Sequence, residues 1–98
     1  MGRYVMLINF TDQGIRDYKG SVERSRKAKD AFRSKGATLS TVYWTLGAYD
    51  IVALAEAPDD ETITAANLAL GALGNVRTTT LRAFDESEMQ KIVAKASG

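Results

Sequence analysis

The sequence predicts an α+β fold, in which an antiparallel four-stranded sheet carries two helices on one face. Two observations support this prediction, and the chain length bounds the number of domains. Four segments rich in β-branched, aliphatic and aromatic residues alternate with amphipathic helical segments. Two of the strand segments are joined by the short corner Gly47-Ala48, which is typical of an antiparallel hairpin. The length of 98 residues is that of one domain, so we expect a single domain over residues 1–98.

The first half of the chain begins with a strand. Residues 4–10 are apolar at nearly every position, and residues 11–14 have turn and capping chemistry. Apolar residues then recur at helical spacing, but Gly20 interrupts them, and a glycine inside a helix costs about 1 kcal/mol relative to alanine. We therefore expect a loose turn up to Gly20, a regular helix over about 21–36, and a strand over 37–46.

The second half repeats this order. A strand is predicted over residues 49–57, a helix over about 58–73, and the fourth strand over 76–84. Acidic residues follow Pro58 and Phe84, where they would complement the dipole of a helix that starts there. The resulting order is β-α-β-β-α-β with an added C-terminal helix, which is the ferredoxin-like split βαβ arrangement.

Composition excludes several kinds of site. The formal net charge of +1 disfavours a general binder of nucleic acid. The absence of Cys and His excludes thiolate chemistry, histidine catalysis and ordinary transition-metal sites, so a metal would need oxygen ligands. No phosphate-binding glycine motif is present. We expect no cofactor, metal, nucleic acid or membrane partner, and the N-terminus lacks signal-peptide features, which indicates a cytoplasmic location.

Both faces of the predicted sheet are apolar. Side chains alternate between the two faces of a strand, and in residues 4–10 and 51–55 both sets are apolar. Two helices can cover only one face, so the other must meet a second subunit, the C-terminal helix or a bound ligand. We expect a homo-oligomer that assembles through this open face, and a pocket for a small-molecule ligand is compatible with such an interface.

The corner Gly47-Ala48-Tyr49-Asp50 supports two interpretations. In the structural one, Gly47 adopts a positive φ, Asp50 accepts hydrogen bonds from turn amides, and Tyr49 packs with its hydroxyl near the surface. In the functional one, Tyr49 and Asp50 line the mouth of a cavity, where Asp50 binds a cation or orients a ligand amine.

Three further residues are candidate ligand contacts. Tyr43 and Trp44 are adjacent in a strand and must point to opposite faces of the sheet. Arg82 lies inside a predicted strand and needs a carboxylate or water. Pairing with Glu56, or with an acid of a second subunit, is one interpretation of Arg82, and binding of an anionic ligand is the other. None of these candidates is assigned a catalytic role.

Charge is unevenly distributed along the chain. Residues 12–35 contain eight basic and four acidic residues, whereas residues 50–61 contain five acidic residues and no basic one. These segments are either ordinary solvated faces or complementary patches that dock two copies together. The basic helix could also face an anionic ligand or an acidic partner surface.

The segments YWTLGAYDIVALAEAPDDET and GNVRTTTLRAF resemble the GYD domain family, which is named for its Gly-x-Tyr-Asp corner. The likeness extends over essentially the whole chain and is most specific at residues 47–50, 57–60 and 82–84. It implies a ferredoxin-like fold in a family largely without an assigned activity. A looser likeness, at residues 47–50 and 74–80, is to the ligand-binding domain of leucine-responsive regulators, whose domains assemble through their sheets and bind small effectors at subunit contacts. No helix-turn-helix precedes the first strand, so direct operator binding is not expected.

These observations favour a self-associating small-molecule-binding or sensory module without catalytic machinery. A second hypothesis is a cofactor-free monooxygenase or isomerase of the dimeric α/β barrel type, which would use Tyr43, Trp44 or Tyr49 with Asp50. A third is a structural assembly subunit. The fold is shared by all three classes and does not decide between them.

Overall fold

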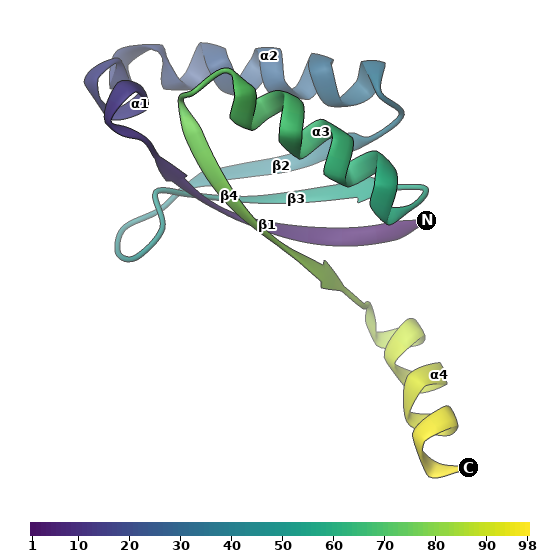
Figure 1. Ribbon diagram of the computed structural model, residues 1–98. Coiled ribbons are helices and arrows are strands. Elements are labelled where there is room, and N and C mark those ends of the chain that lie inside the picture. The colour runs from purple at the N-terminus through teal and green to yellow at the C-terminus, as the bar shows by residue number, and fades with distance from the viewer.

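The structure, a computed structural model of residues 1–98, has the predicted α+β architecture (Figure 1). Its five helical segments and four strands follow in the order β1 (Gly2–Phe10), α1 (Asp12–Arg16), the short 3-10 turn η1 (Tyr18–Gly20), α2 (Ser21–Ser34), β2 (Thr38–Trp44), β3 (Ile51–Ala57), α3 (Asp60–Ala72), β4 (Val76–Ala83) and α4 (Glu86–Ser97). The predicted interruption at Gly20 is confirmed, because a separate helical turn precedes α2.

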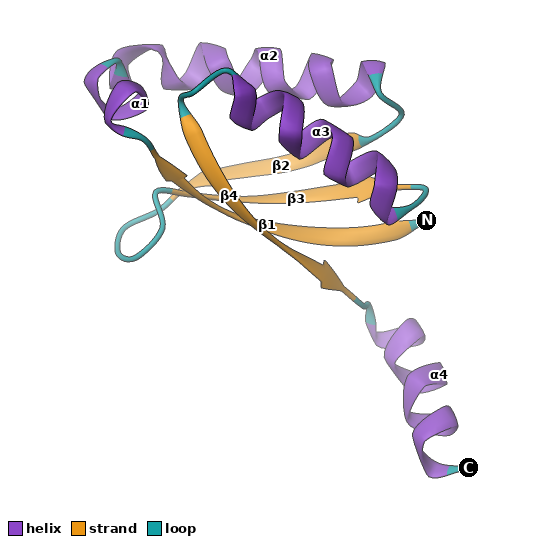
Figure 2. Cartoon of the chain, viewed as in Figure 1, coloured by secondary structure: helices purple, strands orange, loops and turns teal.

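The strands form one antiparallel sheet in the order β2-β3-β1-β4. This is the arrangement expected of a split βαβ fold, since the two strands that flank α2, like the two that flank α3, are separated in the sheet by a third strand. Helices α2 and α3 lie on one face of the sheet, and no element of the chain covers the other face (Figure 2).

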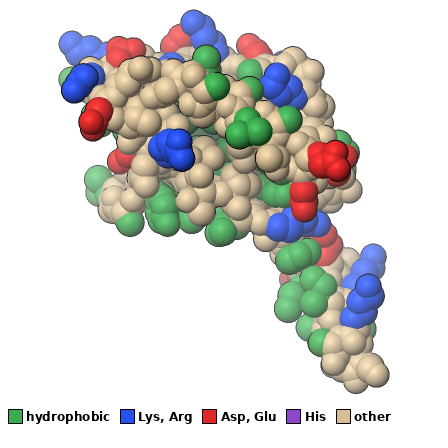
Figure 3. Space-filling model, in the orientation of Figure 1, with side chains coloured by type: hydrophobic (Ala, Val, Ile, Leu, Met, Phe, Trp, Pro, Cys, Tyr) green, Lys and Arg blue, Asp and Glu red, His purple; other side chains and the backbone are tan.

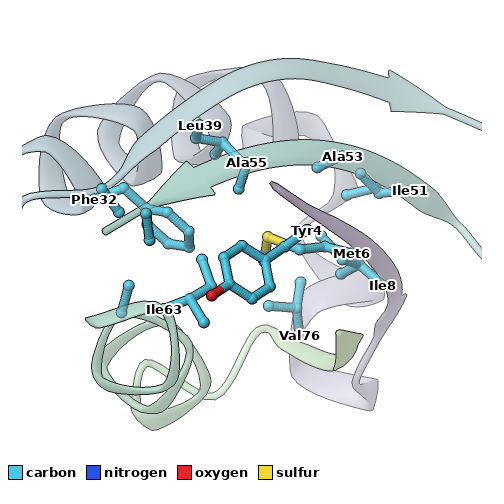
Figure 4. Packing of buried hydrophobic residues seen from close by; sticks show 13 residues of the cluster. Tyr4, Met6, Ile8, Phe32, Leu39, Ile51, Ala53, Ala55, Ile63 and Val76 are labelled. Atoms are coloured by element: carbon cyan, nitrogen blue, oxygen red, sulfur yellow. The ribbon is translucent and has the colours of Figure 1, made fainter. Parts of the chain in front are cut away.

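The core lies between the sheet and these two helices. Alternate residues of β1, namely Tyr4, Met6 and Ile8, are buried on the helix side, where they meet Phe32 of α2 and Ile63 of α3 (Figure 4). Alanines occupy much of the rest of this layer. Burial of apolar surface here is the main source of stability for a domain of this size.

Polar side chains fix the ends of two helices. Asp59 caps α3, because its Oδ1 accepts a hydrogen bond of 2.8 Å from the backbone N–H of Thr62. Asp85 caps α4 in a reciprocal capping box, in which Glu88 accepts from the Asp85 backbone N–H and Asp85 accepts from that of Glu88. The acidic segments predicted to start both helices therefore contain their capping residues.

Two sequence-based expectations are corrected by the structure. The connection between β2 and β3 is not a two-residue corner but a loop that spans residues 45–50. The C-terminal helix is not available to cover the open face of its own sheet, because α4 projects away from the body at the end of β4 (Figure 1).

Candidate functional site

The Gly-x-Tyr-Asp loop is held by backbone-directed hydrogen bonds. Gly47 has a φ of +106°, the positive value predicted for it. The backbone N–H of Thr45 donates to the Asp50 carbonyl over 2.9 Å, and the Thr45 hydroxyl donates to the Tyr49 carbonyl over 2.6 Å. The loop is thus closed at its base by Thr45, while its tip around Gly47 is exposed.

Asp50 connects this loop to the neighbouring strand. Its backbone N–H donates to the Ile8 carbonyl, and its Oδ2 accepts from the backbone N–H of Phe10, each over 2.9 Å. The expectation that Asp50 accepts from turn amides is wrong, because its partner is the last residue of β1, 40 positions earlier. The carboxylate supplies an acceptor just beyond the last pair of the ladder between β1 and β3, Ile8 with Ile51.

Tyr43 and Trp44 lie on opposite faces of the sheet, as predicted. The indole Nε1 of Trp44 donates to Ser21 Oγ at the start of α2 over 2.8 Å, so Trp44 is on the helix side. Tyr43 pairs across the sheet with Val52 and lies on the open face, with 60% of its surface exposed. The two aromatic residues therefore cannot line one pocket within a single chain.

Arg82 lies at the other end of the sheet. Its guanidinium stacks over the ring of Phe84, 4.6 Å from the ring centre, and approaches that of Tyr4 at 5.7 Å. The expected pairing with Glu56 is wrong: the carboxylate partner of Arg82 is Glu88 of α4, at 3.4 Å. Glu56 lies instead 3.8 Å from Arg3.

Around Arg82 the structure gathers a polar cluster that sequence reasoning missed. Arg3 pairs with Asp85 at 2.9 Å and with Glu88 at 3.1 Å, so two arginines hold the first turn of α4 against the sheet. The hydrogen bond from the Asp85 backbone, with a smaller contribution from Arg82, keeps the pKa of Glu88 below its ordinary value. The only signal for this cluster in the sequence is Arg3, a charge directly beside the apolar segment 4–10.

Tyr4 connects this end of the sheet to the start of α3. Its buried ring carries a hydroxyl that donates to Asp60 Oδ1 over 2.6 Å. That bond, together with burial, raises the pKa of Tyr4 above its ordinary value, because ionisation would remove the donated proton beside a carboxylate.

The five predicted ligand contacts do not form one site. Asp50 touches the end of β1 at Phe10, whereas Arg82 pairs with Tyr4 near its start. At about 3.3 Å per residue these positions are about 20 Å apart along the strand. Asp50 and Arg82 therefore act separately, the first on the hairpin loop and the second on the anchor of α4.

The open face of the sheet is the largest feature without a partner in the chain. Cross-strand register places apolar side chains in two rows on this face, one formed by Tyr43, Val52 and Leu7, the other by Leu54, Val5 and Leu81. Leu54 and Leu81 are 41% and 47% exposed. We refer to these six residues as the open face.

Helix α4 carries a second exposed apolar surface. Met89, Ile92 and Val93 follow helical spacing on one side and are 49%, 36% and 51% exposed. Hydrophobic side chains lie along the lower side of the body and on the side of α4 that is turned toward it (Figure 3). We call Met89, Ile92 and Val93 the α4 stripe.

Comparison with known families identifies the chain. The sequence model of the GYD domain matches residues 4–93. The chain belongs to the GYD domain family. The Gly47-to-Asp50 loop, closed by Thr45 and fastened to β1, is the motif from which the family takes its name. None of the helices of this member is both long and apolar enough to cross a membrane.

A curated protein and a solved structure, both from Thermus thermophilus, match this chain over nearly their whole length. The glutamine synthetase and cystathionine beta-lyase binding protein is 31% identical over 90 residues, which cover 91% of this chain and 95% of that protein. The crystal structure of TTHA0845 is 26% identical, with a TM-score of 0.57, and the match covers 87% of this chain and 95% of that one.

A third likeness is to the fold alone. The crystal structure of MtbAldR superposes with a TM-score of 0.68 at 16% identity, over 87% of this chain. The match covers 52% of MtbAldR, so this chain spans about half the length of that protein. The architecture is shared, but activity does not follow from architecture.

Proposed function

We propose that this GYD domain is a self-associating binding module, assembled through its open face. The observation that carries the proposal is the unpartnered pair of apolar rows on the side of the sheet opposite α2 and α3. Monomeric proteins rarely expose a contiguous apolar surface of this kind, and its covering by a second copy would remove it from water.

The α4 stripe extends this surface. Ion pairs of Arg3 and Arg82 with the first turn of α4 orient its apolar side relative to the sheet. A second copy seated on the open face would meet the stripe as well. In a two-fold dimer the contact is reciprocal, so each α4 would pack against the sheet of the other chain.

Variants at two leucines test this assembly. Leu54→Asp puts a charge in the middle of the open face, and we expect analytical ultracentrifugation to detect a single chain. Leu68→Asp is the matched control, because Leu68 is a 70% exposed residue of α3, on the other side of the sheet. It should retain the oligomer of the wild type. Equal sedimentation of the wild type and both variants would show that the open face is not the interface between copies.

The bound partner in this proposal is a protein or a small molecule met at the assembled surface. The first is favoured by the Thermus relative, which its name describes as binding glutamine synthetase and cystathionine beta-lyase. Surface plasmon resonance with those two purified enzymes tests whether this chain shares the property. Binding by the wild type and not by Leu54→Asp would support a protein-binding module, and no binding to either enzyme would leave small molecules as the partner class to screen.

A catalytic function has less support. A monooxygenase or isomerase that used Tyr43, Trp44 or Tyr49 with Asp50 would need these groups within reach of one substrate. Trp44 bonds to α2, Tyr43 lies on the opposite face, and the Asp50 carboxylate is bonded to the backbone of Phe10. The geometry favours binding over catalysis.

A further inference from the structure

A cleft of about 490 Å³ lies on the helix side of the sheet, between α2 and α3. Its floor is formed by partly buried residues of the sheet, Phe10 and Val42, and its walls by Ala28 of α2 and by Ala69 and Leu70 of α3. Small side chains on both helices leave this space where larger ones would close it. The volume is within the range of about 300–1,000 Å³ that is usual for small-molecule sites.

The charges around this cleft are all of one sign. Arg24 and Lys27 of α2, and Lys35 at its C-terminal end, are the charged residues that line it, and no Asp or Glu does so. Arg24 is already occupied, because it binds the Asp17 carboxylate at 3.0 Å and the Gly14 carbonyl at 3.2 Å.

Unlike Arg24, the side chains of Lys27 and Lys35 have no carboxylate partner. Both are exposed, and neither forms an ion pair in the structure. They are eight residues apart along α2 and its C-terminal cap, which separates them by about 12 Å along the helix axis. The cleft therefore combines an apolar interior with two free cations at its rim.

We propose that this cleft binds an anionic amphiphile, with its aliphatic chain between α2 and α3 and its carboxylate at Lys27 or Lys35. The apolar interior favours a hydrocarbon chain because burial there removes apolar surface from water. The rim selects the charge of the head group, since its cations attract an anion and no carboxylate is present to hold a cation. The site is on the opposite side of the sheet from the open face, so it does not depend on self-association.

Trp44 is positioned to report on this cleft. It is the single tryptophan of the chain, and its indole nitrogen donates to the hydroxyl of Ser21, which lines the cleft. A chain that enters between α2 and α3 would change the surroundings of that indole. Tryptophan fluorescence therefore serves as a reporter of binding near Ser21, on the helix side of the sheet.

The test uses decanoate as the probe, below the concentration at which it forms micelles, with affinity measured by calorimetry and position by Trp44 fluorescence. Decyltrimethylammonium, with a chain of the same length and a cationic head, is the charge control. We expect saturable binding of decanoate with a fluorescence change, and weaker binding of the cation. Replacing both rim lysines, Lys27→Gln with Lys35→Gln, should weaken decanoate by about fivefold or more, whereas Lys29→Gln on the same helix should not.

A steric variant makes the location decisive. Ala69→Leu fills part of the cleft and should lower decanoate affinity while circular dichroism shows a folded protein; if it does not fold, the lysine variants decide alone. The proposal is overturned if decanoate does not bind, if the cationic probe binds equally well, if the lysine variants bind as the wild type does, or if calorimetric binding leaves Trp44 fluorescence unchanged. The molar mass of each variant in solution is measured as well. A variant that loses decanoate binding but keeps the mass of the wild type has lost the ligand site and not the oligomer.

Discussion

The carboxylate of Asp50 accepts a hydrogen bond from the backbone N–H of Phe10 over 2.9 Å, and this is the side-chain contact that fastens the Gly-x-Tyr-Asp loop to the end of β1. Two strands that are adjacent in the sheet are thereby tied at the point where their ladder stops. The acidic residue of the family motif has a structural role here that needs no ligand.

Replacement of Asp50 tests that role. Asp50→Ala leaves the Phe10 N–H without its acceptor, so we expect a loss of about 1–3 kcal/mol in unfolding free energy by urea denaturation. Asp50→Asn retains an acceptor oxygen and should lose less. Asp30→Ala removes only an exposed ion pair with Arg33 and should change stability by about 0.5 kcal/mol or less. Equal stability of Asp50→Ala and the wild type would show that the contact contributes nothing.

Two glycines test the effect of backbone strain, because steric crowding is absent at both. A side chain at Gly47 or at Gly71 would meet no atom within 4 Å, but only Gly47 has a positive φ. Gly47→Ala should therefore destabilise the protein by about 1–3 kcal/mol. Gly71→Ala, inside α3, should stabilise it by up to about 1 kcal/mol. Thermal unfolding of the two variants measures the difference, and shifts of the same sign would contradict the assigned conformation of Gly47.

The fold could be predicted from local patterns, because strand and helix periodicity, capping residues and glycine positions are all properties of short segments. The partners of polar side chains could not. The sequence predicts a bond from Asp50 to its own turn, as one interpretation, and Glu56 as one of several partners for Arg82, yet the partners in the structure are Phe10 and Glu88. Such pairs depend on sheet register and on the direction in which α4 leaves the sheet, and no local pattern encodes either.

The hydroxyl of Tyr4 should titrate late. Its hydrogen bond to Asp60 raises its pKa above the ordinary value of about 10. A raised folded-state pKa means that the bond contributes fully to stability below that ordinary value, and that the contribution is lost as pH rises through the raised one. Absorbance titration of the four tyrosines should therefore show a late component that is missing in Tyr4→Phe. An unchanged late component in Tyr4→Phe would assign it to another tyrosine.

The anchor of α4 should weaken in acid. The pKa of Glu88 is lowered by the Asp85 backbone hydrogen bond and by Arg82. A lowered folded-state pKa means that its contribution is present above the ordinary glutamate value of about 4.3 and is lost as pH falls through the lowered one. We expect circular dichroism to show loss of helix in that acidic range.

Two glutamines test this assignment. Glu88→Gln should already have a weakened α4 at neutral pH and a smaller acid-dependent change. Glu86→Gln is the control, since Glu86 is exposed in the same helical turn and forms no ion pair. Glu86→Gln should lose helix in acid as the wild type does. If Glu86→Gln alone abolished that loss, Glu86 and not Glu88 would be the group that anchors α4.

We expect the open face of the sheet to be covered by a second copy of the chain. The most direct measurement is the molar mass of the wild-type protein in solution, by light scattering coupled to size-exclusion chromatography at micromolar concentration. The expected molar mass is at least twice the chain mass of 10.7 kDa. A mass of 10.7 kDa that does not rise with concentration would contradict it.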